Sequence, residues 1–443
     1  MEAFCKKPAH MPTKTELYTN HISSNELNFL PKIQNNLSYD KNIKWIRDKD
    51  ISFLDLFIRS VDCLQNKQSN SNPMFNAIMQ EPTSEKDKRQ FAQYFTPADV
   101  ALYTAYQLLK DFDYKNNIVF DPCAGKGSLL IAAGIVLSIK NGLKGETLLE
   151  LLRGSEISYD TYNETIENII NGLSAFIKGV KKEKAVSILT KNIICADFLE
   201  INIPANSYVI ANPPYKEDKT KTVKNIWIDF AAKISLDNNV QALGLIVPVS
   251  ICSADRTKDI RKNIKDNFGS ITALHHEIRP RPLFNKVEQR ISIFNATKKS
   301  KEYIYHTTGF IGHKSGERIK VWENDFVSIN YDDFSDIFPK VGISDIDFYI
   351  KQKNAKKKLG DIKKGNKELL WVRTTGRYKL AAQYEDPPLI TTKWKKLYIP
   401  QVTAAAIIKA FNSGDALKWW KMFGDGRDIS ITKFLNNYGI LNA

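Results

Sequence analysis

The sequence predicts an α/β protein built on a mainly parallel sheet. From about residue 89 to residue 297, short apolar runs alternate with segments whose apolar residues recur at helical spacing. This alternation is typical of βαβ units. The apolar runs are continuous, as expected when helices cover both faces of a parallel sheet. We therefore predict a Rossmann-like sheet with helices on both faces.

The expected elements follow one another along the chain. Strands are predicted for the apolar runs at 117–121, 151–156, 191–197, 207–212 and 241–250. Helices are predicted for 51–64, 128–139, 159–173, 226–236 and 257–268. The first strand-helix-strand step is longer than usual, so residues 141–154 are expected to add a turn or a short helix.

The composition suggests two or three domains and a polyanionic partner. A chain of 443 residues exceeds one ordinary core. We predict a helical N-terminal region (1–88), an α/β domain (89–297) and a C-terminal region (298–443). The net charge of +15 favours nucleic acid as a partner, and a membrane surface second. A merely solubilising basic surface is the alternative. The basic excess is local too, with eleven Lys and Arg against two acids within 351–380.

Cysteine usage and hydropathy indicate a reducing compartment. The five cysteines are scattered and form no C-x-x-C pair, which argues against a disulfide framework and against a zinc site. The N-terminus lacks the apolar segment of a signal peptide. No stretch reaches the ~18 apolar residues that a membrane span requires. We expect a cytoplasmic protein without a metal.

A glycine turn follows the first predicted strand. The stretch "VFDPCAGKGSLL" (119–130) places Asp121 at the strand tip and Gly125 and Gly127 before the next helix. Ligands of α/β sheets bind beyond the carboxyl ends of the strands, and glycines let the backbone approach them. Asp121 is placed to accept a hydrogen bond from a cationic amine. The dinucleotide pattern is incomplete, because position 130 is Leu, and no P-loop is present. A tight turn without a ligand is the alternative.

Acidic residues end the next two predicted strands. Glu156 closes "LLRGSE" and can accept from two ribose hydroxyls, with Glu150 as the fallback. Asp197 closes "KNIICAD" and is followed by Phe198, a pair that suits an adenine amine and an adenine face. Either acid alone is more simply an N-cap. Together the three strand tips outline a nucleoside with a charged amino-acid tail, which describes S-adenosylmethionine.

The stretch "VIANPPYK" (209–216) ends the fourth strand. The amide oxygen of Asn212 and the carbonyl of Pro213 can accept hydrogen bonds from one planar NH2 group, which makes its lone pair available for attack. Pro213 and Pro214 hold both acceptors rigidly, as preorganised catalysis requires. Tyr215 can stack on the ring that carries the NH2 group, so replacement by Phe is expected to be nearly silent. A structural proline turn is the alternative.

These motifs resemble the DNA amino-methyltransferases of the gamma group. "DPCAGKGSLL", "GSEI", "ADF" and "NPPY" resemble the family's cofactor, ribose, adenine and catalytic motifs, and "QYFTPADVALYTAYQLL" (93–109) its upstream motif. The resemblance covers about half of the chain and implies adenine N6 as the methyl acceptor and S-adenosylmethionine as the cofactor. It implies ten cofactor-binding residues, namely Thr96, Pro97, Asp121, Cys123, Ala124, Gly125, Gly127, Glu156, Asp197 and Phe198. It also makes Phe284 a candidate second ring against the target base, with plain core as the equal alternative.

The C-terminal region is expected to hold duplex DNA while the target base is flipped out. Trp371, Arg373, Arg377 and Tyr378 are candidates for phosphate contacts and base edges, with a solvated lysine-rich loop as the alternative. Deleting 300–443 is expected to spare cofactor binding and abolish tight DNA binding. The expected partners are DNA, which would bring the protein to the nucleoid, and a separately encoded restriction endonuclease, without a membrane. A non-catalytic DNA-binding modification or specificity subunit, or an enzyme acting on RNA or a protein glutamine, stays open.

Overall fold

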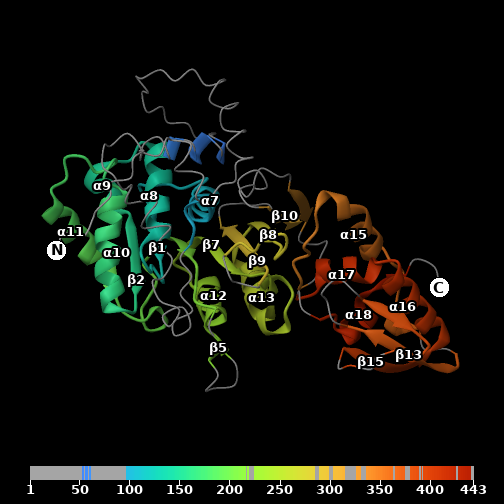
Figure 1. The fold of residues 1–443 in the computed structure, drawn as a ribbon. Coiled ribbons are helices and arrows are strands. Elements are labelled where there is room, and N and C mark those ends of the chain that lie inside the picture. Colours follow the sequence, from blue (N-terminus) through green and yellow to red (C-terminus); the bar gives the residue numbers. More distant parts are fainter. Residues whose placement is uncertain are drawn as a thin grey trace, which may run out of the picture.

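The computed structural model describes a large α/β part and a smaller C-terminal part (Figure 1). Structural statements below concern only the described residues, which are 52–53, 55–57, 59–60, 96–215, 217–218, 224–284, 289–298, 303–314, 326–330, 336–362, 365–374, 380–388, 391, 393–425 and 428–440. No helix within these ranges is long and apolar enough to cross a membrane.

A nine-stranded sheet forms the centre of the α/β part, in the order β11-β10-β8-β9-β7-β4-β1-β2-β3. Its strands are β1 (Ile118–Asp121), β2 (Leu152–Glu156), β3 (Ile193–Cys195), β4 (Ser207–Ala211), β7 (Val240–Pro248), β8 (Ser270–His276), β9 (Ile291–Thr297), β10 (Ile304–Ile311) and β11 (Val327–Asn330). The five predicted strands are β1, β2, β3, β4 and β7, and they pair in parallel. Strand β9 runs antiparallel between β7 and β8. The predicted fold class is confirmed.

The burial of the strands shows that both faces of the sheet are covered. Successive side chains of a strand point to opposite faces. Every residue of β4 is buried, and in β7 only one is half-exposed. On these faces lie α7 (Ala98–Leu108), α8 (Ser128–Asn141), α9 (Gly145–Glu150), α10 (Tyr159–Gly172), α11 (Lys182–Asn192), α12 (Ile226–Leu236) and α13 (Lys258–Asn267). The expected short helix between the first two strands is α9.

Helix α11 was not predicted. Its sequence "KEKAVSILTKN" buries only three residues, Ala185, Ile188 and Leu189, which is too few for a recognisable apolar stripe. It runs to Asn192 and therefore shortens β3 from the predicted 191–197 to three residues.

The large sheet continues past residue 298. Strand β10 pairs in parallel with β8, and β11 pairs with β10. Phe338 and Val341 also belong to the main hydrophobic core. The expected boundary at 298 therefore falls between two neighbouring segments of one sheet, and the division into three regions stays a prediction.

A second core lies in the smaller part. Its elements are α15 (Ile346–Lys353), β12 (Lys357–Lys358), β13 (Lys367–Arg373), β14 (Ala381–Gln383), β15 (Trp394–Pro400), α16 (Gln401–Asn412), α17 (Asp415–Phe423), α18 (Ile431–Asn437) and β16 (Gly439–Ile440). The antiparallel sheet β14-β13-β15 packs Leu370 and Val372 against Ile407, Trp419 and neighbouring residues of the helices.

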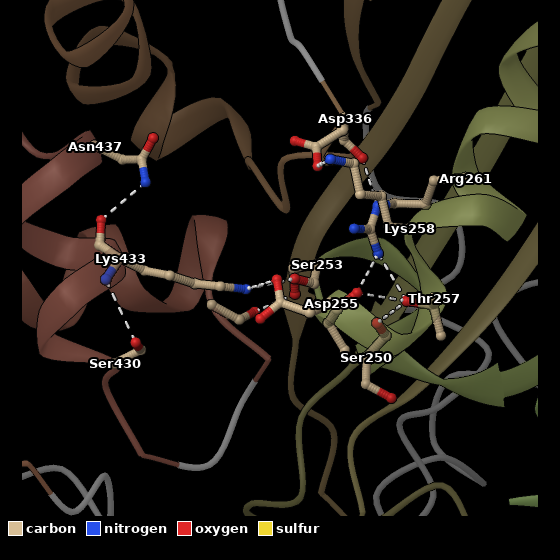
Figure 2. A network of polar contacts seen from close by, with 12 residues as sticks. Ser250, Ser253, Asp255, Thr257, Lys258, Arg261, Asp336, Ser430, Lys433 and Asn437 are labelled. Atoms are coloured by element: carbon tan, nitrogen blue, oxygen red, sulfur yellow. Dashed lines mark hydrogen bonds and ion pairs between the residues drawn. The ribbon is translucent and has the colours of Figure 1, made fainter. Parts of the chain in front are cut away.

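A polar junction joins the two parts at the loop that follows β7 (Figure 2). Lys433 of α18 pairs with Asp255 at 2.6 Å. The buried Lys340 ammonium donates to the Gly424 carbonyl at 2.7 Å and to Ser253 Oγ at 3.1 Å. Burial lowers the pKa of Lys340 to about 8. These contacts fix the C-terminal part to the loop after β7, a strand that borders the candidate active site.

Only a few N-terminal residues are described. Between 53 and 60 they are helical, in agreement with the helix predicted for 51–64. Phe53, Leu56 and Phe57 belong to the main core, and the Phe53 ring meets Tyr103 edge-on at 5.0 Å. The rest of the predicted N-terminal region lies outside the described residues.

Candidate active site

The glycine turn lies between β1 and α8, at the carboxyl edge of the sheet. Gly125 and Gly127 have φ of 53° and 84°, a left-handed conformation that favours glycine. A Cβ on Gly127 would lie 3.1 Å from Ile169. Ala124 and Cys123 complete the turn, whose backbone is anchored because the Ala124 N–H donates to the Ser155 carbonyl at 2.9 Å. The turn is thus held tightly against the end of β2.

Glu156 ends β2 and closes this turn. Its carboxylate accepts from the Gly125 N–H at 2.9 Å and from the Ser158 N–H at 3.0 Å. Burial raises the pKa of Glu156, and these backbone donors act against the shift. A lone pair that remains on the carboxylate can face a ribose hydroxyl. Glu150, the fallback acid, lies exposed at the end of α9 instead.

Asp121 carries a buried acceptor without a partner. Its Oδ1 accepts from the Cys123 N–H at 3.0 Å, whereas no described residue bonds the buried Oδ2. Burial, with a smaller contribution from Glu156, raises the pKa of Asp121 to about 7. A buried carboxylate oxygen in this state is costly unless a ligand supplies a donor. A cationic amine meets that need, so the residues fit S-adenosylmethionine at this position.

Asp197 and Phe198 follow β3, but the surroundings of their two side chains differ. Asp197 is half-buried and caps a short 3-10 helix by accepting from the Leu199 N–H at 2.9 Å. The Phe198 ring is buried, with Phe230 at 4.8 Å and the Lys233 ammonium 4.8 Å from its centroid. The capping alternative for Asp197 is therefore present in the structure, and an adenine contact of either residue stays a prediction.

Ile157 was missed by sequence reasoning. It directly follows Glu156 at the tip of β2, and 68% of its side chain is exposed although it is apolar. Apolar side chains at such a tip suit the face of a flat heteroaromatic ring. The signal in the sequence was an isoleucine after the last acid of a strand, just before the capping residue Ser158.

The NPPY motif leaves β4 at Asn212, and the side-chain amide of this residue is held from both sides. Asn212 Nδ2 donates to Thr96 Oγ1 at 3.0 Å, and Asn212 Oδ1 lies 2.9 Å from the Tyr215 hydroxyl. That hydroxyl also lies 2.9 Å from the Ile246 carbonyl of β7. Thr96 precedes α7 at Pro97, which occupies the cap position of that helix. The upstream motif, the catalytic motif and β7 thus meet at one amide.

The Tyr215 hydroxyl has a role that the sequence could not reveal. The residue is 9% exposed, and burial raises its pKa well above the usual range, so the hydroxyl stays protonated. Its single proton serves either Asn212 Oδ1 or the Ile246 carbonyl. The expectation that Phe in this position is nearly silent must therefore be corrected, because Phe removes a contact to the amide.

Cys123 connects the glycine turn to the catalytic motif. Its thiol accepts a hydrogen bond from the Asn212 backbone N–H, and burial together with Asp121 and Glu156 raises its pKa well above the usual range. The thiol is therefore neutral. The cofactor turn and the catalytic amide are adjacent in space, as their positions at neighbouring strand tips predict.

Residues 66–242, which contain the site just described, match the family model "N-6 DNA Methylase". This segment is similar to N-6 DNA methylases. The match takes in the glycine turn, both strand-tip acids and the NPPY motif, and it covers less than half of the chain.

Solved structures resemble the chain at low identity. A DrdV–DNA complex is 13% identical with a TM-score of 0.43, over 57% of this chain and 32% of that one. A type I restriction-modification methyltransferase subunit from Streptococcus thermophilus is 15% identical with a TM-score of 0.34, over 67% and 75%. The M protein of the type I restriction enzyme EcoKI is 17% identical with a TM-score of 0.38, over 90% and 83%. The chain spans a fifth to a third of the first three such structures. No curated protein matches it.

The remaining candidate residues are Phe284 and four residues of the C-terminal region. Phe284 is 3% exposed and belongs to the main hydrophobic core. This agrees with the alternative in which Phe284 is a core residue and does not contact the target base. Trp371 is 2% exposed, and its indole N–H donates to Asp386 at 2.7 Å. The ring therefore cannot contact DNA directly in this conformation. Arg373 is half-buried at the end of β13. Arg377 and Tyr378 lie outside the described residues.

Proposed function

We propose that the chain is a site-specific DNA methyltransferase that transfers a methyl group from S-adenosylmethionine to adenine N6 of a flipped-out base, in a restriction-modification or phage-defence setting. The observation that carries the proposal is the Asn212 amide, held between Thr96 and Tyr215 beside the Asp121 turn. It lies inside a segment that matches an N-6 DNA methylase. Duplex DNA is the proposed substrate, supported by the net charge of +15.

Cofactor binding is assigned to the residues around the glycine turn. Asp121 Oδ2 would accept from the amino group of S-adenosylmethionine, Glu156 would face its ribose, and Asp197 its adenine. The Thr96 hydroxyl accepts from Asn212, so its own proton is available to the cofactor's carboxylate. When bound, the cofactor supplies an electrophilic methyl group.

The target amine is activated by the rigid acceptors of the NPPY motif. Asn212 Oδ1 and the Pro213 carbonyl each accept one N–H of the target NH2 group, which shifts the nitrogen toward tetrahedral geometry and frees its lone pair. Oδ1 can do so while it accepts from Tyr215, because an amide oxygen has two lone pairs. The Tyr215 ring stacks on the base. After transfer the nitrogen releases its extra proton to water, so no strong base is required.

The test is transfer of labelled methyl groups to duplex DNA, with the product nucleoside identified after digestion. We expect N6-methyladenine from the wild-type chain. Asn212→Ala should bind S-adenosylmethionine normally in calorimetry and lose about 10²–10³ in rate, the usual effect of removing one preorganised partner. Wild-type rate in Asn212→Ala would refute the mechanism.

Two other functions predict different products in the same assay. A non-catalytic DNA-binding modification or specificity subunit would bind duplex DNA and release no methylated nucleoside. An enzyme acting on RNA or on a protein glutamine would label those substrates and leave DNA unlabelled. The intact set Asp121, Asn212, Pro213, Pro214 and Tyr215 favours a catalytic role. A separately encoded restriction endonuclease is the proposed partner.

A further inference from the structure

The small sheet β14-β13-β15 has one face toward helices and one face away from them. Leu370 and Val372 of β13 and Leu397 of β15 pack into the second core with α16, α17 and α18. Neighbouring residues of a strand point the opposite way. Cross-strand pairing therefore places Arg373 beside Trp394, and Trp371 beside Lys396, on the other face. We call this other side of the sheet the outer face.

The outer face combines basic and aromatic side chains. Its strand positions include three basic residues, Lys367, Arg373 and Lys396, and no acid. Tyr398 stands on it with 70% of its side chain exposed, an unusual position for a large ring. Positive charge interleaved with exposed rings is complementary to a nucleic-acid backbone.

The buried Trp371 ring lies directly beneath the exposed side chains of this face. Its ring is 2% exposed, its indole N–H is bound by Asp386, and the Lys396 ammonium lies 4.6 Å above its centroid. The indole face thus holds the Lys396 ammonium in place, and Lys396 remains exposed. A lysine held in this way loses less side-chain freedom when it meets a phosphate.

The small sheet and the segment that follows the NPPY motif lie on the same side of the molecule in Figure 1. Strand β5 (Glu217–Asp218), which follows Tyr215 almost directly, lies on the lower side of Figure 1. The β13 and β15 strands also lie on that side, with α16, α17 and α18 above them. The segment after the NPPY motif and the strands of the small sheet thus share one side of this view.

We propose that the outer face of the β14-β13-β15 sheet is a docking surface for the phosphate backbone of duplex DNA. Lys396, Lys367 and Arg373 provide the phosphate contacts, and the Tyr398 ring packs on the adjoining sugars. This inference rests on the proposed function and assigns its DNA contact to specific side chains. The sequence pointed to Trp371, Arg373, Arg377 and Tyr378; of these, Arg373 is retained here, and the Trp371 ring is buried beneath the exposed side chains.

The test compares neighbouring lysines of one strand by titration of a random-sequence duplex at several salt concentrations. Lys396→Gln and Lys367→Gln alter the outer face. Lys395→Gln is the matched control, since Lys395 is equally charged, exposed and adjacent, but pairs with Val372 on the helix side. Each outer-face variant should lower affinity several-fold and reduce the slope of log affinity against log salt by about 0.9 per lost phosphate contact.

The aromatic residue gives a second, independent measurement. Tyr398→Ala should lower affinity without changing the salt slope, because the ring carries no charge. Tyr303→Ala, which removes another exposed tyrosine at 56% before β10, is its control and should bind as the wild type does. Because Tyr398 is mostly exposed, Tyr398→Ala should keep the wild-type circular dichroism spectrum. This holds even if Lys396→Gln disturbs the packing around Trp371.

Three results would overturn the proposal. Equal losses of duplex affinity in Lys395→Gln and Lys396→Gln would mean that the DNA responds only to the overall positive charge of the protein. Unchanged duplex binding in all outer-face variants would place the DNA elsewhere. Lost affinity for poly-L-glutamate with unchanged affinity for the duplex would assign the face to an acidic protein. Wild-type binding of DNA without methylation would instead refute the proposed function and leave this surface in place.

Discussion

Replacing Tyr215 by Phe isolates the hydroxyl that touches the catalytic amide. The Phe ring keeps the surface on which a base stacks, so affinity for DNA should not change. The variant loses one hydrogen bond, because the hydroxyl has a single proton for Asn212 Oδ1 and the Ile246 carbonyl. One such bond contributes about 1 kcal/mol, which corresponds to a loss of about fivefold in rate. The loss should appear in kcat with KM for DNA unchanged.

The assay is single-turnover methyl transfer at saturating DNA and S-adenosylmethionine, which separates the transfer step from product release. Thr96→Val removes the other contact to the amide and should cost a similar factor. Because both residues hold the same group, the double variant should lose less than the product of the two single losses. A wild-type rate in Tyr215→Phe would show that the hydroxyl does not position the amide. A loss as large as that of Asn212→Ala would show that it does more than position it.

The remaining predictions concern the cofactor turn and its surroundings. Asp197→Ala should weaken S-adenosylmethionine binding in calorimetry, and equal affinity would remove Asp197 from the site. Affinity for S-adenosylmethionine should rise from about pH 6 to about pH 8, because the Asp121 carboxyl, with its pKa raised to about 7, must ionise to accept from an amine. The same raised pKa means that the folded state holds a proton which the unfolded chain releases, so Asp121 contributes less stability as pH rises through about 7. Asp121→Asn should therefore melt higher than the wild type at about pH 8 and bind the cofactor weakly at every pH; a wild-type pH profile in this variant would exclude the carboxyl as the titrating group. Gly127→Ala should destabilise the fold by about 1–2 kcal/mol in chemical denaturation, because φ is 84° there and the new Cβ would meet Ile169; unchanged stability would contradict the strain argument.

The parallel core of the fold was predictable because its signal is local. Each of the strands β1, β4 and β7 is a continuous apolar run, and the helices between them repeat at helical spacing. Helix α11 and strands β10 and β11 were not recognised, because a polar helix and strands that contain several polar residues carry little apolar pattern. Their place is decided by pairing with residues distant in the sequence.

The site was predictable in its positions and less so in its contacts. Strand tips bring Asp121, Glu156 and Asn212 together whatever the details of packing. The bond from Asn212 to Thr96 spans more than a hundred residues, and the burial of Trp371 depends on Asp386 and Lys396, so neither follows from a motif. The expected effect of deleting 300–443 must also be restated, because that deletion would remove β10 and β11 from the main sheet.

The junction at the loop after β7 bears on how recognition can be exchanged between related proteins. Ser253 and Asp255 of this loop hold Gly424 and Lys433 of the C-terminal part, and Lys340, which lies between Phe338 and Val341 of the main core, also bonds Ser253. Ile246 of the strand before this loop contacts the Tyr215 hydroxyl. A graft that brings a new C-terminal module must therefore keep Lys433, or leave Asp255 without its cation beside the strand that supports Tyr215. Substitutions on the outer face of the small sheet leave this junction intact, whereas an exchanged C-terminal module has to keep its junction residues.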